Sequence, residues 1–307
     1  MAKSQQVRVG TRGSSMALAQ TQLVVGRLKV LHPELDIQTQ IITTRGDTNL
    51  APIPLDTVGK AWFTEEIEQA LQDGAIDLAI HSLKDVPPEI GAGLQVLAVL
   101  KRDDPRDALV ARDGKTLAEL PNGAVVGTDS LRRKALLLAC RPDLRVQSVR
   151  GNATTRLEKL KNGAYDALVM AVAGLERIGR ADVITDYFDA ETFVPAIGQG
   201  ALAAEWRSER EDIGAFVAAL GDPKTLAAVA AEQAFAAVVG GGCKLPVGCY
   251  VRFENETAQV YGMAGSMDGT KVVIKTASGP ADQAIGLART LAEELAAEPF
   301  VAQYVNA

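Results

Sequence analysis

The hydrophobic pattern of the chain repeats one local design three times. A short apolar run ends in a turn of glycine, serine or threonine, and a segment with helical periodicity follows. These predicted strand–turn–helix segments cover residues 7–28, 124–139 and 146–163. The turns hold residue types that commonly begin helices, namely Thr11, Ser14, Ser15, Thr128, Ser130, Asn152 and Thr154.

The two halves of the chain also resemble each other. The segment DGAIDLAIHSL at 73–83 matches NGAYDALVMAV at 162–172, and VRVGTRGS resembles VVGTDSLR. Each half is therefore predicted to form an α/β domain, and the two should share a topology. In open α/β sheets ligands bind at the carboxyl ends of the strands, which is where the three turns are expected.

Residues from about 221 onward follow a different pattern. An alanine-rich helical run at 225–239 precedes short alternating strands at 251–277, in which Asp268-Gly269 indicates a hairpin turn. A last helix is expected at about 281–297. This part is predicted to be a small α+β domain with an antiparallel sheet.

Two segments are predicted to connect the α/β domains. One is KRDDPRD at 101–107, which is charged and contains a proline, and the other is VPAIGQGALAAEW at 194–206. We therefore predict a first α/β domain from 1–100 and 200–220, a second from 101–199, and the C-terminal domain from 221–307. Two crossing strands between two lobes would give a hinged clamshell with a ligand cleft.

Composition narrows the classes of partner. A formal net charge of −6 argues against a nucleic-acid or membrane-surface binder. No apolar run is long enough to span a bilayer, and the N-terminal MAKSQQVRVGT holds no apolar signal-peptide core. Three cysteines do not make a disulfide framework, so a cytoplasmic location is expected.

Arginines lie in or beside the first helical turn that follows each of the three loops. They are Arg12, Arg132 with Arg133, and Arg150 with Arg156. Positive charge is unfavourable at a helix N-terminus unless an anion binds there. The alternative is that these are solvated arginines paired with nearby acids. Three occurrences favour the first interpretation, and they predict a small ligand with several negative charges.

The cysteines suggest different roles. Only two histidines and no closely spaced cysteine pair occur, so no metal site is predicted. Cys140 and Cys249 are expected to be core thiols. Cys243 follows three glycines and precedes Lys244, which favours a thiolate, so it is either a structural loop cysteine or a covalent attachment point.

Asp85, in HSLKDVPP, follows a strand whose residues 78–80 are predicted to be buried. It is either a turn aspartate paired with Lys84, or a carboxylate that faces a cleft and stabilises a developing cation or transfers a proton.

Eight motifs occur in one order: TRGSSMALAQ, ITTRGD, HSLKDVPP, GTDSLRR, RGNATTRL, AVAGLERI, PAIGQGAL and GGGCKLPVG. With them the chain resembles the porphobilinogen deaminase (hydroxymethylbilane synthase) family over essentially its whole length. The resemblance implies two similar hinged α/β lobes, like type II periplasmic-binding-protein domains, and a small C-terminal α+β domain.

The resemblance also implies a reaction. The enzymes of this family expel ammonia from porphobilinogen and join four such units into the linear tetrapyrrole hydroxymethylbilane. A dipyrromethane cofactor primes the reaction and is linked through a thioether to the loop cysteine, which is Cys243 here. Asp85 matches the catalytic aspartate. Porphobilinogen is the expected partner, no nucleic acid or membrane is expected, and a monomer is expected.

Further site residues follow from the same match. Contacts with cofactor or substrate carboxylates are expected from Arg12, Ser14, Ser82, Lys84, Thr128, Ser130, Arg132, Arg133, Arg150, Arg156 and Arg177. Gln20 and Gln199 match polar cleft positions, Lys60 belongs to a loop before the second helix, and Phe63 matches an aromatic near the active site.

One loop departs from the family pattern. It reads LDTVGKAWFTEE, so Ala61-Trp62 replaces Gly-Leu and Asp56 falls where an upstream lysine is usual. The competing interpretation of the whole chain is a two-lobed protein that binds small anions without catalysis. Such a protein has no need for Cys243.

Overall fold

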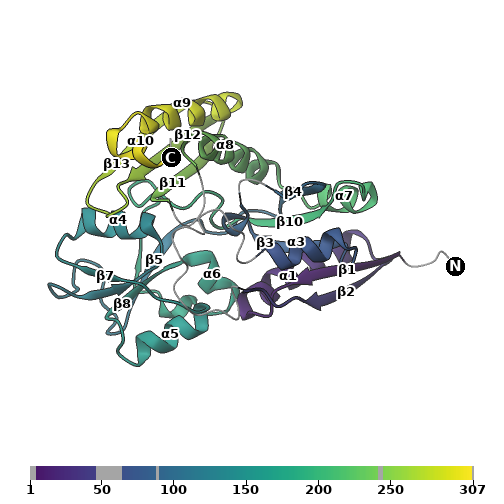
Figure 1. The fold of residues 1–307 in the computed structure, drawn as a ribbon, viewed down its shortest axis with the longest axis horizontal. Helices are drawn as coiled ribbons and strands as arrows, with labels where there is room; N and C mark the ends of the chain where they lie inside the picture. The colour runs from purple at the N-terminus through teal and green to yellow at the C-terminus, as the bar shows by residue number, and fades with distance from the viewer. Residues whose placement is uncertain (1–4, 46–63, 88–89, 241–244, 306–307) are drawn as a thin grey trace. The chain divides into compact units, whose positions relative to one another are not determined.

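The computed structural model describes residues 5–45, 64–87, 90–240 and 245–305. The chain divides into two compact units, shown in Figure 1. The first unit comprises Met1–Arg102 and Ala201–Leu226, and the second comprises Asp103–Gly200 and Ala227–Ala307. Two of the three unit boundaries fall in the predicted connecting segments, and the third lies between Leu226 and Ala227. The division into three domains at residues 100, 200 and 220 stays a prediction, because the second unit includes the C-terminal residues.

The first unit is built on a mixed five-stranded sheet. Its strand order is β2-β1-β3-β10-β4. The strands are β1 (Gln5–Thr11), β2 (Leu35–Ile41), β3 (Leu78–Ser82), β4 (Leu94–Val99) and β10 (Leu202–Arg207). Strand β1 is parallel to β2 and β3, whereas β10 is antiparallel to β3 and β4. A strand from the second half of the chain thus completes the sheet of the first unit.

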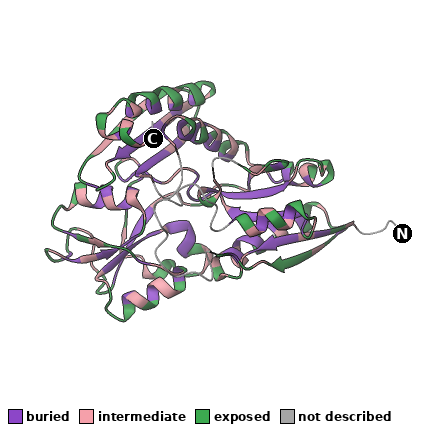
Figure 2. Ribbon diagram, in the orientation of Figure 1, coloured by how far each residue is buried: buried purple, intermediate pink, exposed green. Residues whose placement is uncertain are grey.

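Helices cover both faces of this sheet. They are α1 (Ser15–Leu31), α3 (Glu65–Gln72) and α7 (Glu211–Ala218), and a 3₁₀ turn, η2 (Leu83–Asp85), follows β3. Apolar residues of α1 and α7 pack against Leu78 and Ile80, and those of α3 pack against Ala79. Successive residues of β3 therefore face opposite helical layers, which explains why nearly the whole strand is buried (Figure 2).

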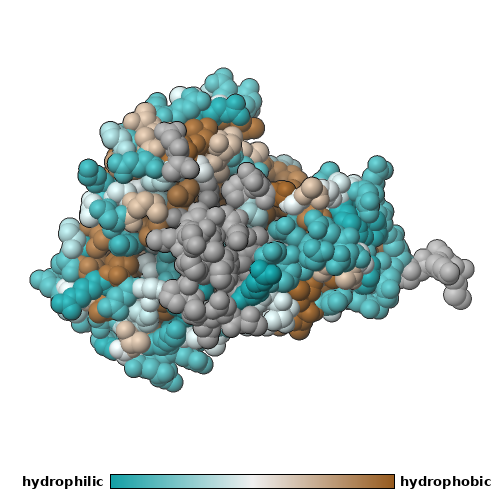
Figure 3. Space-filling view, viewed as in Figure 1, coloured by the Kyte–Doolittle hydropathy of each residue, from teal (hydrophilic) through white to brown (hydrophobic). Residues whose placement is uncertain are grey.

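Hydrophilic side chains cover the outer surface of α3 (Figure 3). Ile67 and Leu71 of this helix are buried, whereas Glu65 and Gln69 are exposed. This one-sided pattern fixes which face of α3 packs on the sheet.

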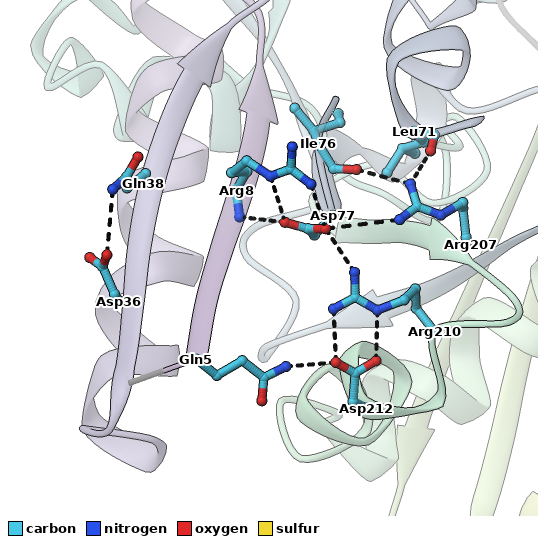
Figure 4. A network of polar contacts seen from close by, with 10 residues as sticks. All are labelled: Gln5, Arg8, Asp36, Gln38, Leu71, Ile76, Asp77, Arg207, Arg210 and Asp212. Carbon is cyan, nitrogen blue, oxygen red and sulfur yellow. Dashed lines mark hydrogen bonds and ion pairs between the residues drawn. The ribbon is translucent and has the colours of Figure 1, made fainter. Parts of the chain in front are cut away.

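A polar cluster around Asp77 ties the amino-terminal end of β3 to its neighbours (Figure 4). The Asp77 carboxylate accepts hydrogen bonds from the backbone N–H and the guanidinium of Arg8, at 2.9 and 3.0 Å, and from Arg210 Nη1 at 2.8 Å. These bonds hold its pKa below the usual value although burial acts in the opposite direction. Arg210 also forms a bidentate pair with Asp212.

The second unit contains a sheet with the same plan. Its strand order is β7-β6-β8-β5-β9. The strands are β5 (Asp107–Ala111), β6 (Val125–Gly127), β7 (Arg145–Gln147), β8 (Ala167–Ala171) and β9 (Asp186–Tyr187). Strand β6 is parallel to β7 and β8, and β5 is antiparallel to β8 and β9. The internal resemblance extends to one contact, because Asp166 accepts the Val125 N–H at 2.8 Å much as Asp77 accepts that of Arg8.

The second unit also holds a three-stranded antiparallel sheet. Its strands are β11 (Val247–Glu254), β12 (Thr257–Gly265) and β13 (Val272–Pro280). The remaining helical elements in the described part of the chain are α4 (Leu131–Cys140), α5 (Ala153–Lys161), α6 (Val172–Arg177), η3 (Ala181–Val183), α8 (Pro223–Val239), η4 (Ala281–Gln283), α9 (Ala284–Ala296) and α10 (Pro299–Val305). Residues of α8, α9 and α10 share one apolar core with β11 and β12.

The predicted fold class is confirmed, because the structure has two α/β lobes and a small C-terminal sheet. The predicted hairpin at Asp268-Gly269 joins β12 to β13, and Gly269 has a φ of +80°. Cys249 is buried in the core as predicted. The prediction for Cys140 was wrong, because this residue ends α4 and is exposed.

Candidate functional site

The loop after β1 carries the first predicted site residues. Ser14 caps α1 and its hydroxyl accepts the Ala17 N–H at 3.2 Å. Arg12 lies two residues before this cap. The first turn of α1 contains no acidic residue, so the loop presents a guanidinium together with the positive end of a helix dipole.

The end of β3 brings a second group of predicted residues to the same place. The Gln20 side-chain amide donates to the Ser82 hydroxyl at 2.7 Å, which links buried Gln20 of α1 to the last residue of β3. Asp85 ends η2 and is exposed. Lys84 lies beside it in the same turn and is half-buried.

Apart from Lys84, these residues line one pocket within the first unit. Its described lining consists of Arg12, Ser14, Met16, Ala17, Gln20, Thr64, Ile80, His81, Ser82 and Asp85. Strands β1 and β3 are parallel, so their carboxyl ends meet at the edge of the sheet where the pocket lies. The lining combines one guanidinium, one carboxylate, one imidazole and several hydroxyl and amide groups. It can therefore bind a carboxylate while keeping an acid–base group nearby.

The predicted arginines of α4 form a buried cluster in the second unit. Asp107 is fully buried and accepts from Arg132 Nη2 at 2.7 Å and from Arg133 Nη2 and Nε at 2.6 and 3.0 Å. Gln199, also fully buried, donates to the same carboxylate at 2.9 Å. Arg132 and Arg133 additionally donate to backbone carbonyls. Both arginines therefore have a structural role besides any contact with a ligand.

The two helix starts that were predicted in the second unit, those of α4 and α5, are capped by residues of the expected types. Ser130 caps α4, and the Thr128 hydroxyl accepts the Ser130 N–H at 3.2 Å. Asn152 caps α5 and accepts the Thr155 N–H at 2.9 Å.

Arg150 and Arg156 both lie at the start of α5. Arg156 Nε donates to the Gly151 carbonyl oxygen at 2.8 Å. The Arg150 carbonyl oxygen accepts from Lys159 Nζ at 2.9 Å. The two arginines thus lie close together in one basic turn.

Arg177 occupies a different setting. Its guanidinium lies 2.8 Å from the Asp103 carboxylate and donates to the Gly200 carbonyl oxygen at 2.6 Å, and its side chain is 6% exposed. It therefore joins the two connecting segments where they run side by side. Asp103 N–H also donates to Gly200.

Three predicted site residues, Lys60, Phe63 and Cys243, lie outside the described residues, as does Asp56. Several residues of the site were not predicted. Thr64 and His81 line the pocket, Glu205 contacts His81, and Asp107 organises the arginine cluster. Of these, His81 is the first residue of HSLKDVPP, and Asp107 is the last residue of KRDDPRD. Glu205 belongs to the second connecting segment, but its contact with His81 comes from a strand that is distant in the sequence.

The described residues contain no cluster of three or more histidine, cysteine or acidic side chains that could hold a metal ion. Among those residues no helix has the length and apolarity to cross a membrane.

Comparisons with known proteins agree with the motifs. Residues 7–215 match the family model for the porphobilinogen deaminase, dipyrromethane cofactor binding domain, and residues 226–297 match that for the C-terminal domain. A porphobilinogen deaminase of Roseiflexus castenholzii is 46% identical over 288 residues, which cover 94% of each chain. One of Brevibacillus brevis is 45% identical over 292 residues, covering 95% of this chain and 94% of the relative.

A solved structure that is similar in part is the periplasmic aliphatic sulphonate binding protein SsuA from Escherichia coli. It has a TM-score of 0.42 and 19% identity, over 76% of this chain and 70% of that one. The family follows from the sequence matches, which cover nearly the whole chain. The chain belongs to the porphobilinogen deaminase family.

Proposed function

We propose that this protein is a transferase of tetrapyrrole biosynthesis that joins four porphobilinogen molecules, with loss of ammonia, into hydroxymethylbilane. The observation that carries the proposal is the pocket at the carboxyl ends of β1 and β3, where Asp85 lies with Arg12, Ser14, Gln20 and Ser82. Membership of the porphobilinogen deaminase family indicates the reaction, and the pocket contains side chains whose chemistry suits it.

The substrate explains the polar lining of the pocket. Porphobilinogen is a pyrrole that carries acetate and propionate groups and an aminomethyl group. A guanidinium can pair with a carboxylate through two hydrogen bonds, and the N-terminus of α1 adds backbone donors. Arg12 and Ser14 are therefore proposed to bind substrate carboxylates, with Ser82 and Gln20 as further hydrogen-bonding groups and Lys84 as a nearby cation.

Asp85 is proposed to be the catalytic residue. Loss of ammonia leaves positive charge on a pyrrole, and the ring that attacks must then lose a proton from carbon. An ionised carboxylate at the pocket stabilises the first charge and can accept the proton in the second step. Asp85 ends the short turn η2, whose Val86 N–H donates to the Leu83 carbonyl oxygen at 3.1 Å, so the backbone that carries Asp85 is fixed directly after β3.

The residues of the second unit fit the cofactor named in the family model. Dipyrromethane carries four carboxylates, and it supplies the pyrrole position to which new units are added. Among the described residues, the buried cluster has two guanidinium groups around one carboxylate, Asp107, so positive charge predominates there. We propose that Arg132 and Arg133, with Thr128 and Ser130, hold cofactor carboxylates. Arg150, Arg156, Arg177 and Gln199 are proposed as further contacts.

The covalent link is part of the proposal. By the match of GGGCKLPVG, Cys243 would form a thioether to the cofactor, and Lys60 and Phe63 would contribute from the loop before α3. A monomer in the cytoplasm and the predicted three-domain boundaries belong to the same proposal.

Two measurements on the purified protein test it. Incubation with porphobilinogen should release ammonia and give a product that oxidises to porphyrin. The intact mass should exceed that of the polypeptide by two pyrrole units, on the peptide with Cys243. Cys243→Ser should abolish the adduct, whereas Cys140→Ser, which alters an exposed thiol, should keep it. A bare polypeptide mass with full activity would refute the covalent link.

A protein that only binds small anions would behave differently in the same assays. It would bind porphobilinogen without releasing ammonia, and replacing Asp85 would leave binding unchanged. That result would favour the alternative, a protein that binds small anions without catalysis.

A further inference from the structure

A buried histidine–glutamate pair lies at the pocket and has no part in the chemistry above. His81 Nε2 is 2.9 Å from Glu205 Oε2, and their side chains are 5% and 2% exposed. His81 lines the pocket, whereas Glu205 is not part of its lining. Glu205 therefore lies behind His81 as seen from the pocket.

Strand register places the pair on the α3 face of the sheet. Ala203 of β10 is opposite His81, and Glu205 is opposite Ala79. Residues two apart on a strand share a face, so His81 and Glu205 are diagonal neighbours on the side where Ala79 packs against α3. Ser82 faces the other side and contacts Gln20 of α1.

Further charged groups face this region. Glu68 of α3 has a raised pKa, first because of burial and then because of Glu205, while Thr64 and His81 act in the opposite direction. The Thr64 hydroxyl donates to Glu68 at 2.7 Å. Arg207 of β10 is directed to the Leu71 and Ile76 carbonyl oxygens, and on the pocket side lie Arg12 and Asp85.

The pair is neutral when it holds one proton in total. This is true whether the pair is imidazolium with carboxylate or imidazole with carboxylic acid. Without that proton the pair carries a net negative charge, with no counter-charge from the imidazole. An unneutralised Glu205 would also repel any other carboxylate nearby, and Asp85 is the carboxylate among the described residues of the lining.

We propose that His81 is a positioning residue that neutralises Glu205, so that Asp85 is the carboxylate whose charge acts in the pocket. The proposal rests on the proposed function for its consequence in catalysis. The electrostatic effect of the pair on Asp85 involves residues of the first unit alone, and it can be measured without turnover.

The test compares His81→Gln, Glu205→Gln and the double variant with the wild type. In each, selective ¹³C labelling of aspartate follows the titration of the Asp85 carboxyl, assigned by its loss in Asp85→Asn. At an effective dielectric constant of about 20, a unit charge roughly 8–12 Å away moves a titration midpoint by about 1 to 1.5 pH units. His81→Gln should raise the Asp85 midpoint by roughly this amount, and adding Glu205→Gln should restore it.

The pH dependence of catalysis should change in the same variants. His81→Gln should shift the acidic limb of the kcat/KM profile by roughly one unit to higher pH, with recovery in the double variant. His32→Gln is the matched control, because His32 also lies beside a glutamate, Glu34, at 3.3 Å but is not part of the pocket. It should change neither readout.

Two results would overturn the proposal: an Asp85 midpoint in His81→Gln equal to that of the wild type, or a double variant as strongly shifted as His81→Gln. If His81→Gln does not fold, Glu205→Gln and the double variant must share one midpoint, and a difference between them would refute it. Absence of porphobilinogen turnover in the wild type would refute the proposed function but leave the titration test intact.

Discussion

Replacement of Asp107 by asparagine should strongly destabilise the second unit. The carboxylate is fully buried and accepts at least four hydrogen bonds, three of them from Arg132 and Arg133. The side chains of these two arginines are only 3% and 9% exposed, so water cannot compensate for the lost charge. Asparagine keeps one side-chain oxygen as an acceptor, but its NH₂ group would face the N–H groups of the arginines, which are also donors.

The expected magnitude follows from burial. Breaking a buried ion pair from one side costs about 3–5 kcal/mol, because the remaining charge is left uncompensated. For a unit of this size the loss corresponds to a fall in Tm of roughly 6–20 °C. Thermal unfolding should be followed by circular dichroism in a Cys243→Ser background, so that loss of a covalent group does not contribute to the change.

Asp143→Asn provides a control in the same unit. Asp143 also forms a bidentate pair, with Arg141, but the two side chains are 34% and 19% exposed. Pairs that water can reach contribute less than buried ones, so this variant should lose at most about 1 kcal/mol of stability. A fall in stability of less than about 1 kcal/mol for Asp107→Asn would show that the arginines do not depend on this carboxylate.

Three further outcomes are expected. Asp85→Asn should lower kcat at least about 10³-fold with an unchanged circular dichroism spectrum, and Asp85→Glu should keep partial activity; near wild-type turnover of the asparagine variant would remove Asp85 from the mechanism. Gly200→Ala should cost at least about 1 kcal/mol more stability than Gly93→Ala. Both glycines have positive φ, +87° and +77°, but a Cβ at Gly200 would lie 2.6 Å from a backbone oxygen while Gly93 has open space; equal melting temperatures would contradict this. Arg210 lowers the pKa of Asp212 to about 2, so this carboxylate stabilises the fold above about pH 4 and the benefit is lost as pH falls towards 2. The Tm difference between wild type and Asp212→Asn should therefore shrink over that range, and a constant difference would contradict the assignment.

Local patterns predicted the elements of the fold well. The residues that cap α1, α4 and α5 are Ser14, Ser130 and Asn152, all of types recognised from the turns. The internal resemblance also indicated two sheets of one plan, because a buried strand after Asp-Gly or Asn-Gly is a local signal. Glycines at both turns have positive φ, +67° at Gly74 and +79° at Gly163.

Contacts between distant segments could not be predicted in this way. Asp107 was read as part of a charged connecting segment, because its partners Arg133 and Gln199 lie 26 and 92 residues away. His81 and Glu205 are separated by 124 residues. A hydrophobic pattern shows that such positions are buried, but only the strand register shows which polar groups meet. Cys140 was misplaced because the pattern did not show where α4 leaves the core.

The position of β10 in the first sheet affects how the protein folds during synthesis. This strand lies between β3 and β4 in the sheet. It consists of residues Leu202–Arg207, so it is synthesised long after both of its neighbours. Translation at about 5–20 residues per second leaves a delay of roughly 5–20 seconds, during which β4 has no partner strand in the sheet. We therefore expect a nascent or truncated chain ending at Arg102 to be sensitive to proteases and to bind chaperones. Resistance to proteases should arise only after β10 has emerged from the ribosome.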